Sequence, residues 1–213
     1  MKLSKLLENL EYEVLNGNID TDINNLVYDS RKAGALDVFV CVTGAVSDGH
    51  TYISDVAGKG VVAIVVEKDI EVTEELKDIT LIKTEDTRYA LALMSAAFFD
   101  YPAKKLKTIG ITGTKGKTTT TFMIRDILEK CNIKTGLIGT NEIIIGDVHI
   151  PSIRTTPESF LIQKYFSQMV EAGCCCVVME VSSQALMLNR TAGILFDIGV
   201  FTNIEPDHIG PNE

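Results

Sequence analysis

The sequence contains no apolar run that approaches the roughly 18 residues needed to cross a bilayer, so a membrane helix is not expected. Its first stretch, MKLSKLLENLEYEVL, lacks the apolar core and cleavage site of a signal peptide. The leucines in this stretch recur at helical spacing, which predicts an acid-rich amphipathic helix instead. We therefore expect a cytoplasmic protein without membrane insertion.

Positive charge is also scarce. The 20 Lys and Arg residues face 29 Asp and Glu residues, for a formal net charge of −9. Because phosphate backbones are bound through clustered basic side chains, this balance argues against a nucleic-acid partner. It does not argue against a small nucleotide, since a few amides, one lysine and a metal ion can overcome the global charge locally.

The chain has few residues that favour soft metals or disulfides. Its five cysteines form no CxxC pair, and none of the three histidines lies at metal-ligand spacing from them. The run at 174–176 leads into VVM, so we interpret it as small residues entering a buried strand. His149 is expected at the surface of a hairpin. His50 is interpreted as part of a structural turn, with a ligand contact as the alternative.

At 213 residues, the chain is long enough for two compact domains. Short helical and strand patterns alternate up to Pro102, where YPAKKLK interrupts them. We place the domains at 1–104 and 105–213. In the second half, strands alternate with helices, which predicts an α/β domain with a mostly parallel sheet and helices on both faces. EIIIGDVHI is predicted to be a hairpin that turns at Gly146-Asp147.

The sequence stops soon after a predicted strand, at DHIGPNE. A doubly wound domain that ended there would hold only three or four parallel strands. We therefore expect the second domain to be truncated.

The segment ITGTKGKTTT lies between a predicted strand and a predicted helix, the context of a phosphate-binding loop. Gly113 and Gly116 allow the backbone amides to curl around phosphate oxygens, and the helix start adds partial positive charge. Lys117 is expected to reach the β- and γ-phosphates, and Thr118 to hold Mg²⁺. The strict motif fails at its first position, where Ile111 replaces glycine. A glycine-rich turn that only starts a helix is the alternative, but four consecutive threonines are a poor helix start.

Two further residues are predicted to meet this loop at the carboxyl edge of the sheet. Glu180 ends the strand VVME, and His208 follows the strand IGVFTNI. With Thr118 they would form a magnesium site. Their alternative roles are a helix cap for Glu180 and a surface position for His208.

These motifs together resemble the Mur ligase family. TGTKGKTTT, RTTPE at 154–158, EVSSQAL at 180–186 and TNIEPDH at 202–208 occur in the order found in that family, and DSR at 29–31 resembles its uridine-nucleotide-binding domain. The TTP element favours the branch that adds the third peptide residue of the peptidoglycan precursor. The fold that this resemblance implies is a small N-terminal α/β domain followed by a P-loop domain.

The resemblance implies an ATP-dependent ligase that activates the acceptor carboxylate as an acyl phosphate, which an amino acid then attacks. Its acceptor would be UDP-N-acetylmuramoyl-dipeptide, its cofactors ATP and Mg²⁺, and the protein a monomer. Lys117, Glu180 and His208 would be catalytic, with Thr118, Glu180 and His208 as metal ligands. ATP would be bound by Gly113, Thr114, Lys115, Gly116, Lys117, Thr118 and Thr119. The acceptor would be bound by Tyr28, Ser30, Ala45, Val46, Ser47, Thr155, Thr156, Ser182 and Arg190.

Some positions depart from the family pattern. Lys115 replaces a common asparagine, Gln184 replaces the usual histidine, and Leu188 occupies a position that is often polar. The family's carbamylated lysine and C-terminal amino-acid-binding domain are not in the sequence, so the 213 residues alone are expected to be inactive. The alternatives are a folylpolyglutamate- or cyanophycin-type ligase, which the DSR domain disfavours, and a non-catalytic nucleotide-binding regulatory protein.

Overall fold

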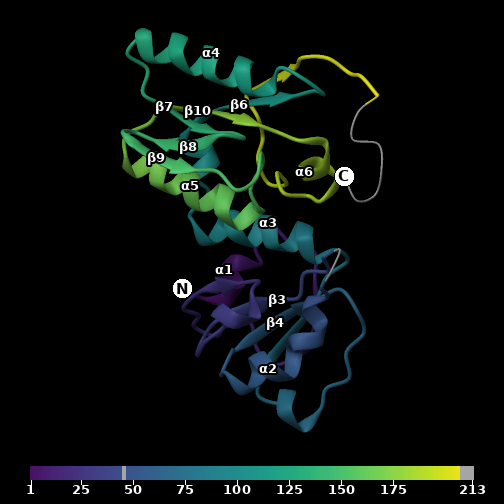
Figure 1. Cartoon of the computed structure of the whole chain (residues 1–213). Helices are drawn as coiled ribbons and strands as arrows, with labels where there is room; N and C mark the ends of the chain where they lie inside the picture. The colour runs from purple at the N-terminus through teal and green to yellow at the C-terminus, as the bar shows by residue number, and fades with distance from the viewer. Residues whose placement is uncertain (45–46, 207–213) are drawn as a thin grey trace. The chain divides into compact units, whose positions relative to one another are not determined.

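The computed structural model describes residues 1–44 and 47–206. The chain divides into two compact units, Met1–Phe98 and the residues from Phe99 onward. Each unit contains one sheet (Figure 1). In the described ranges, no helix combines the length and apolar character needed to cross a bilayer.

The first unit is a five-stranded sheet with the order β1-β5-β4-β3-β2. Strands β2 to β5 run parallel, and β1 pairs antiparallel with β5. Its core is built from the apolar side chains of β3, β4 and β5, packed against α2. The strands are β1 (Glu13–Asn16), β2 (Leu26–Val27), β3 (Val38–Val40), β4 (Ala63–Val66) and β5 (Thr80–Lys83). The helices are α1 (Leu3–Leu6), α2 (Ile53–Gly58) and α3 (Thr87–Phe98), with 3₁₀ turns η1 (Ser30–Lys32), η2 (Gly49–Tyr52) and η3 (Glu74–Leu76).

The prediction of one long N-terminal helix was wrong. The helix ends at Leu6, and Glu13–Asn16 forms an edge strand in which Val14 lies opposite Ile82. The Asn16 side chain donates to the carbonyls of Leu76 and Ile79, which holds the strand against the unit. Pairing with β5 therefore outweighs the helical spacing of the leucines, because strand formation depends on neighbours that are distant in sequence.

The second unit is a six-stranded sheet with the order β11-β6-β10-β7-β8-β9. The first four of these strands are parallel, and β8 and β9 form an antiparallel extension. The predicted α/β class and the hairpin at Gly146-Asp147 are confirmed, and the parallel part has four strands, the upper of the predicted three or four. The strands are β6 (Lys107–Thr112), β7 (Thr135–Ile138), β8 (Glu142–Ile145), β9 (Val148–Pro151), β10 (Cys176–Glu180) and β11 (Ile198–Phe201). The helices are α4 (Lys117–Lys130), α5 (Ser159–Glu171) and α6 (Ser183–Met187), with the 3₁₀ turn η4 (Pro102–Lys105).

Successive residues of β10 face opposite sides of this sheet, as the two-residue period of a strand requires. Val177 and Met179 pack in the core that includes Phe166 of α5, whereas Val178 packs in the core that includes Ile124 of α4. The two helices accordingly cover opposite faces (Figure 1). Because β6, β7 and β10 are parallel, their carboxyl ends and the loops that follow them meet at one edge.

Candidate functional site

The loop between β6 and α4 has the backbone of a phosphate cradle. Gly113 and Gly116 have φ angles of 134° and 84°, in the region that favours glycine. The first backbone bond of the helix runs from Thr120 N to Gly116 O. The amides of Lys117, Thr118 and Thr119 therefore have no acceptor within the helix, and they form its positive end. Such an end is suited to bind phosphate oxygens.

Lys117 and Thr118 lie at the mouth of this loop. The Lys117 Nζ atom donates to the carbonyls of Gly113 at 2.6 Å and Thr114 at 3.1 Å, so its charge lies across the loop. The Thr118 hydroxyl donates to Glu180 Oε2 at 2.9 Å. Thr119 is exposed on the first turn of α4. The predicted nucleotide residues and Glu180 thus converge at one edge of the sheet.

Glu180 is the last residue of β10 and is 1% exposed. Its Oε1 accepts from the Thr140 backbone amide at 2.8 Å, and its Oε2 lies 3.0 Å from the Thr140 hydroxyl. A Cβ atom on Gly139 would lie 2.6 Å from Glu180 Oε1, so only glycine leaves room for the carboxylate. Sequence reasoning missed Thr140. Its position directly after β7, at the same carboxyl edge, was the signal that could have identified it.

The oxygen atoms of Thr118 and Glu180 fit a magnesium ion, a hard cation that prefers oxygen ligands. No group of three or more Asp, Glu, His or Cys side chains suited to a metal occurs among the described residues. One carboxylate and one hydroxyl are nevertheless sufficient where substrate phosphates complete the coordination. The third predicted ligand, His208, lies outside the described residues.

Three of the predicted acceptor-binding residues are connected to Glu180. The Thr156 hydroxyl donates to the Glu180 carbonyl at 2.9 Å and accepts from the Ser182 amide at 3.0 Å. Ser182 also caps α6, because its hydroxyl accepts from the Ala185 amide. The Thr155 hydroxyl lies 3.1 Å from that of Thr140. These contacts tie the RTTP segment to the end of β10.

Arg190 is the fourth predicted acceptor-binding residue in the second unit. Its side chain is buried and contacts Thr156 and Glu158. Its guanidinium donates to the Thr156 carbonyl at 3.2 Å. Its Nε lies 3.1 Å from Glu158 Oε1, an ion pair without hydrogen-bond alignment at that nitrogen. Arg154 pairs with the same carboxylate oxygen. The structure thus places Arg190 behind Thr156, where it supports the segment. Sequence reasoning missed its partner Glu158, although RTTPE contains it.

The predicted uridine-nucleotide residues of the first unit follow β2 and β3. Ser30 is buried at the start of η1, and its carbonyl accepts from Lys59 Nζ at 2.8 Å. Tyr28 lies two residues before it and is partly buried. The hydroxyl oxygens of Ser47 and Tyr52 are 3.3 Å apart. Ala45 and Val46 lie outside the described residues.

A set of charged and polar side chains holds the backbone on either side of the loop after β3, which contains residues 45–47. His50 Nδ1 lies 2.7 Å from Asp48 Oδ1, and its Nε2 accepts from the Glu67 amide at 3.2 Å. Both ring nitrogens contact the chain itself, which favours the interpretation of His50 as a structural turn residue. The Glu67 carboxylate binds the hydroxyl and amide of Thr87 and the hydroxyl of Thr43. We call this set the charged brace: Thr43, Asp48, His50, Glu67, Lys68, Thr87 and Arg88.

The charges in the brace shift the acidity of its carboxyl groups. The ion pair with Lys68, together with the amide and ring of His50, holds the pKa of Asp48 well below its usual value. Burial opposes ionisation of Glu67, but the hydrogen bonds from Thr43 and Thr87 outweigh it and lower the pKa of that group. Both side chains are therefore held as carboxylates.

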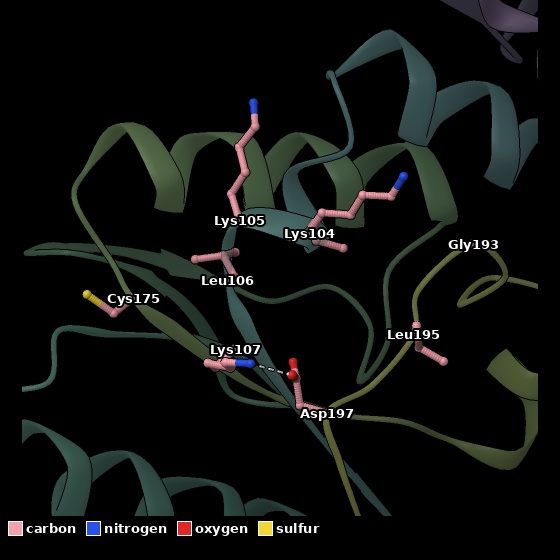
Figure 2. Close-up of a pocket in the computed structure, with 9 residues that line it drawn as sticks. Lys104, Lys105, Leu106, Lys107, Cys175, Gly193, Leu195 and Asp197 are labelled. Atoms are coloured by element: carbon pink, nitrogen blue, oxygen red, sulfur yellow. Dashed lines mark hydrogen bonds and ion pairs between the residues drawn. The ribbon is translucent and has the colours of Figure 1, made fainter.

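A cavity of about 420 Å³ lies at the other end of the second sheet, beside the amino end of β6 (Figure 2). Lys107 contacts Asp197 there at 2.9 Å, and this ion pair lowers the pKa of Asp197 to about 2. Lys104 and Lys105 extend away from that pair in Figure 2. Lys105 pairs with Asp100, and Lys104 lies over the Tyr101 ring. Because the phosphate loop follows the carboxyl end of β6, the cavity at the amino end is separate from it.

Comparisons with known proteins agree with the motifs. The Mur ligase middle domain matches residues 111–211, and the domain described as Mur ligase family, catalytic domain, matches residues 22–99. The chain belongs to the Mur ligase family. UDP-N-acetylmuramoyl-L-alanyl-D-glutamate–2,6-diaminopimelate ligase of Clostridium perfringens is 49% identical over 98% of this chain and 43% of its own length. The corresponding Clostridioides difficile ligase is 43% identical over 98% of this chain and 42% of its own length.

Solved structures of Mur ligases share the fold. A UDP-N-acetylmuramoyl-L-alanyl-D-glutamate–2,6-diaminopimelate ligase matches with a TM-score of 0.78 and 20% identity, over 100% of this chain and 42% of that one. The MurF ligase from Thermotoga maritima in complex with ADP matches with a TM-score of 0.51 and 21% identity, over 84% and 37%. This Mur ligase chain spans less than half the length of each of these four relatives.

Proposed function

We propose that this chain supplies the ATP-binding and acceptor-binding parts of an ATP-dependent amide ligase. Its acceptor is UDP-N-acetylmuramoyl-L-alanyl-D-glutamate, and the added amino acid is 2,6-diaminopimelate, as in the names of its relatives. The observation that carries the proposal is the contact between Thr118 and Glu180 at the mouth of a phosphate-shaped loop. Bound Mg–ATP would supply the phosphoryl group that activates the acceptor carboxylate.

The residues at the sheet edge suit this task because two anions, a carboxylate and a terminal phosphate, must approach each other. Lys117 brings a positive charge to the loop, and the α4 amides add the positive end of a helix. Thr118 and Glu180 would hold the magnesium ion. Fixed charges of this kind are the main assistance that proteins give to phosphoryl transfer.

The acceptor proposal is supported by the position of the RTTP segment. Thr156 contacts Glu180 directly and Thr155 contacts it through Thr140, so a carboxylate bound at these hydroxyls would lie near the metal. Arg190 and Glu158 hold that segment from behind. We propose that Ser30, Tyr28 and the loop at 45–47 bind the uridine diphosphate end.

Titration calorimetry with Mg–ATP tests the nucleotide site. The wild-type chain is expected to bind Mg–ATP, and Lys117→Ala to weaken binding by roughly 100-fold because its ammonium faces the phosphates. Lys105→Ala is the matched control, since that lysine pairs with Asp100 away from the loop. The acceptor site is tested by titrating UDP-N-acetylmuramoyl-L-alanyl-D-glutamate against UDP-N-acetylglucosamine as the control ligand.

The two parts of the proposal can fail separately. No binding of Mg–ATP by the wild type, or equal binding by Lys117→Ala, would contradict the nucleotide site. Equal affinity for the two uridine nucleotides would contradict the proposed acceptor and leave the nucleotide site in place.

A further inference from the structure

The first half of the phosphate loop is held by the segment that follows β11. Thr114 donates its backbone amide to the Asn203 carbonyl at 3.1 Å. The Glu205 amide in turn donates to the Thr114 hydroxyl at 3.0 Å. Residues 202–205 and 113–115 are about 90 positions apart in the sequence, yet their backbones lie in direct contact. Their strands, β11 and β6, are neighbours in the sheet.

Asn203 makes the most specific of these contacts. Its Oδ1 accepts from the Lys115 backbone amide at 2.9 Å, and its Nδ2 donates to the Lys115 carbonyl at 3.0 Å. One carboxamide thus pairs with both polar backbone groups of one loop residue. Thr202 adds a bond from its hydroxyl to the same carbonyl at 2.7 Å. We call Thr202 and Asn203 the bracket.

The fit between bracket and loop leaves no space for a side chain at Gly113. A Cβ atom there would lie 2.2 Å from Thr202 Oγ1 and 2.8 Å from the Asn203 carbonyl oxygen. The second glycine of the loop differs, because a Cβ atom on Gly116 would meet nothing within 4 Å. The first half of the loop is therefore fixed against the bracket, while the turn at Gly116 faces open space.

We infer that Asn203 is a positioning residue for phosphate binding, because it sets the curl of the loop before the nucleotide arrives. This inference rests on the proposed function. The carboxamide fixes the Lys115 peptide groups, and the next residues, Gly116 and Lys117, lead directly into the free amides of α4. A loop that already has its bound shape does not have to be ordered when the nucleotide binds. Binding therefore avoids that entropic cost, and the affinity is higher.

The test compares Asn203→Ala with the wild type by calorimetry, using Mg–ADP and AMP as ligands. Mg–ADP affinity is expected to fall about tenfold, equivalent to ~1.4 kcal/mol, and AMP affinity to change less than twofold. A loss of affinity that is larger for the ligand with more phosphates indicates an effect on the phosphate loop. A general loss of structure would lower the affinity for both ligands equally. Asn203→Asp keeps the acceptor but removes the donor and is expected to be at least as weak.

Asn25→Ala is the control, because it also removes a carboxamide that is hydrogen-bonded within the protein, to Asp37, but does so in the first unit. It is expected to leave Mg–ADP affinity unchanged. Wild-type affinity in Asn203→Ala, or an equal loss for AMP, would overturn the inference and leave the proposed function intact. No Mg–ADP binding by the wild type would overturn both.

Hydrogen exchange of the wild type gives a second measurement that does not depend on a folded variant. The Lys115 amide is expected to exchange at least tenfold more slowly than an unprotected amide, because Asn203 Oδ1 accepts its hydrogen. Unprotected exchange at Lys115 would show that the bracket does not hold the loop.

Discussion

The two units each present a loop at the carboxyl end of a parallel strand, but they hold these loops by different means. The loop after β3 is held by the charged brace, in which Asp48 and Glu67 bind Lys68, His50 and two threonines. The phosphate loop after β6 is held mainly by the neutral bracket and by backbone groups. The neutral bracket itself adds no charge beside Lys117 and the positive end of α4. A charged support makes the first loop sensitive to pH and salt.

The largest expected effect comes from closing the space between the phosphate loop and the bracket. Gly113→Ala would place a Cβ atom 2.2 Å from Thr202 Oγ1 at a φ angle of 134°. We expect Mg–ADP affinity to fall by roughly 100-fold or more, since the loop must leave its position. Calorimetry measures this. Gly58→Ala, where a Cβ atom meets nothing within 4 Å, is the control and should bind normally.

The next effect concerns the charged brace. Glu67→Ala removes the acceptor of the Thr43 and Thr87 hydroxyls and of the Thr87 amide at the start of α3. The free energy of unfolding of the first unit should fall by about 2 kcal/mol. Denaturant-dependent hydrogen exchange in peptides of β3 and β4 measures it. Exposed Glu75→Ala should change little, and a loss of Mg–ADP affinity in Glu67→Ala would show that the two loops are not independently supported.

Acid should weaken the first loop through Asp48. Because the folded-state pKa of this group is below its ordinary 3.8, its contribution to stability is complete above about pH 4. The contribution should be lost progressively as the pH falls further. Between pH 6 and pH 3, the free energy of unfolding of the first unit should therefore fall less steeply with decreasing pH in Asp48→Asn than in the wild type. Asp197→Asn, in the second unit, should leave that slope as in the wild type.

The smallest expected effect tests the ion pair between Lys115 in the phosphate loop and Glu205. Lys115 Nζ pairs with Glu205 Oε2 at 2.6 Å, and both side chains are substantially exposed. Glu205→Gln should raise Mg–ADP affinity about two- to threefold at low salt, because a carboxylate near the phosphates is removed. The gain should disappear at high salt. Asp100→Asn breaks a comparable exposed pair and should have no effect; a loss of affinity in Glu205→Gln would mean that the ion pair supports the loop.

Much of the second unit could be predicted from local patterns. The strand, glycine loop and helix around residues 107–130 and the turn at Gly146 carry signals within a few residues of one another. The edge strand Glu13–Asn16 could not be predicted in this way, because its pairing with β5 lies about 70 positions away. The same reason explains the missed site residues. Thr140, Glu158 and Asn203 act through partners in other elements, which a local pattern does not identify. Only the position of Thr140, directly after a predicted strand, pointed to the edge of the sheet.

Gly139 contributes no side chain to the site, yet it limits how the site can change. Since any β-carbon there would displace the carboxylate of Glu180 from its contacts with Thr140, a library of single substitutions should favour glycine at position 139. In an alignment of active variants, this glycine would be enriched although its missing side chain binds nothing. The importance of a position in the proposed site can therefore reside in an atom that has to be absent.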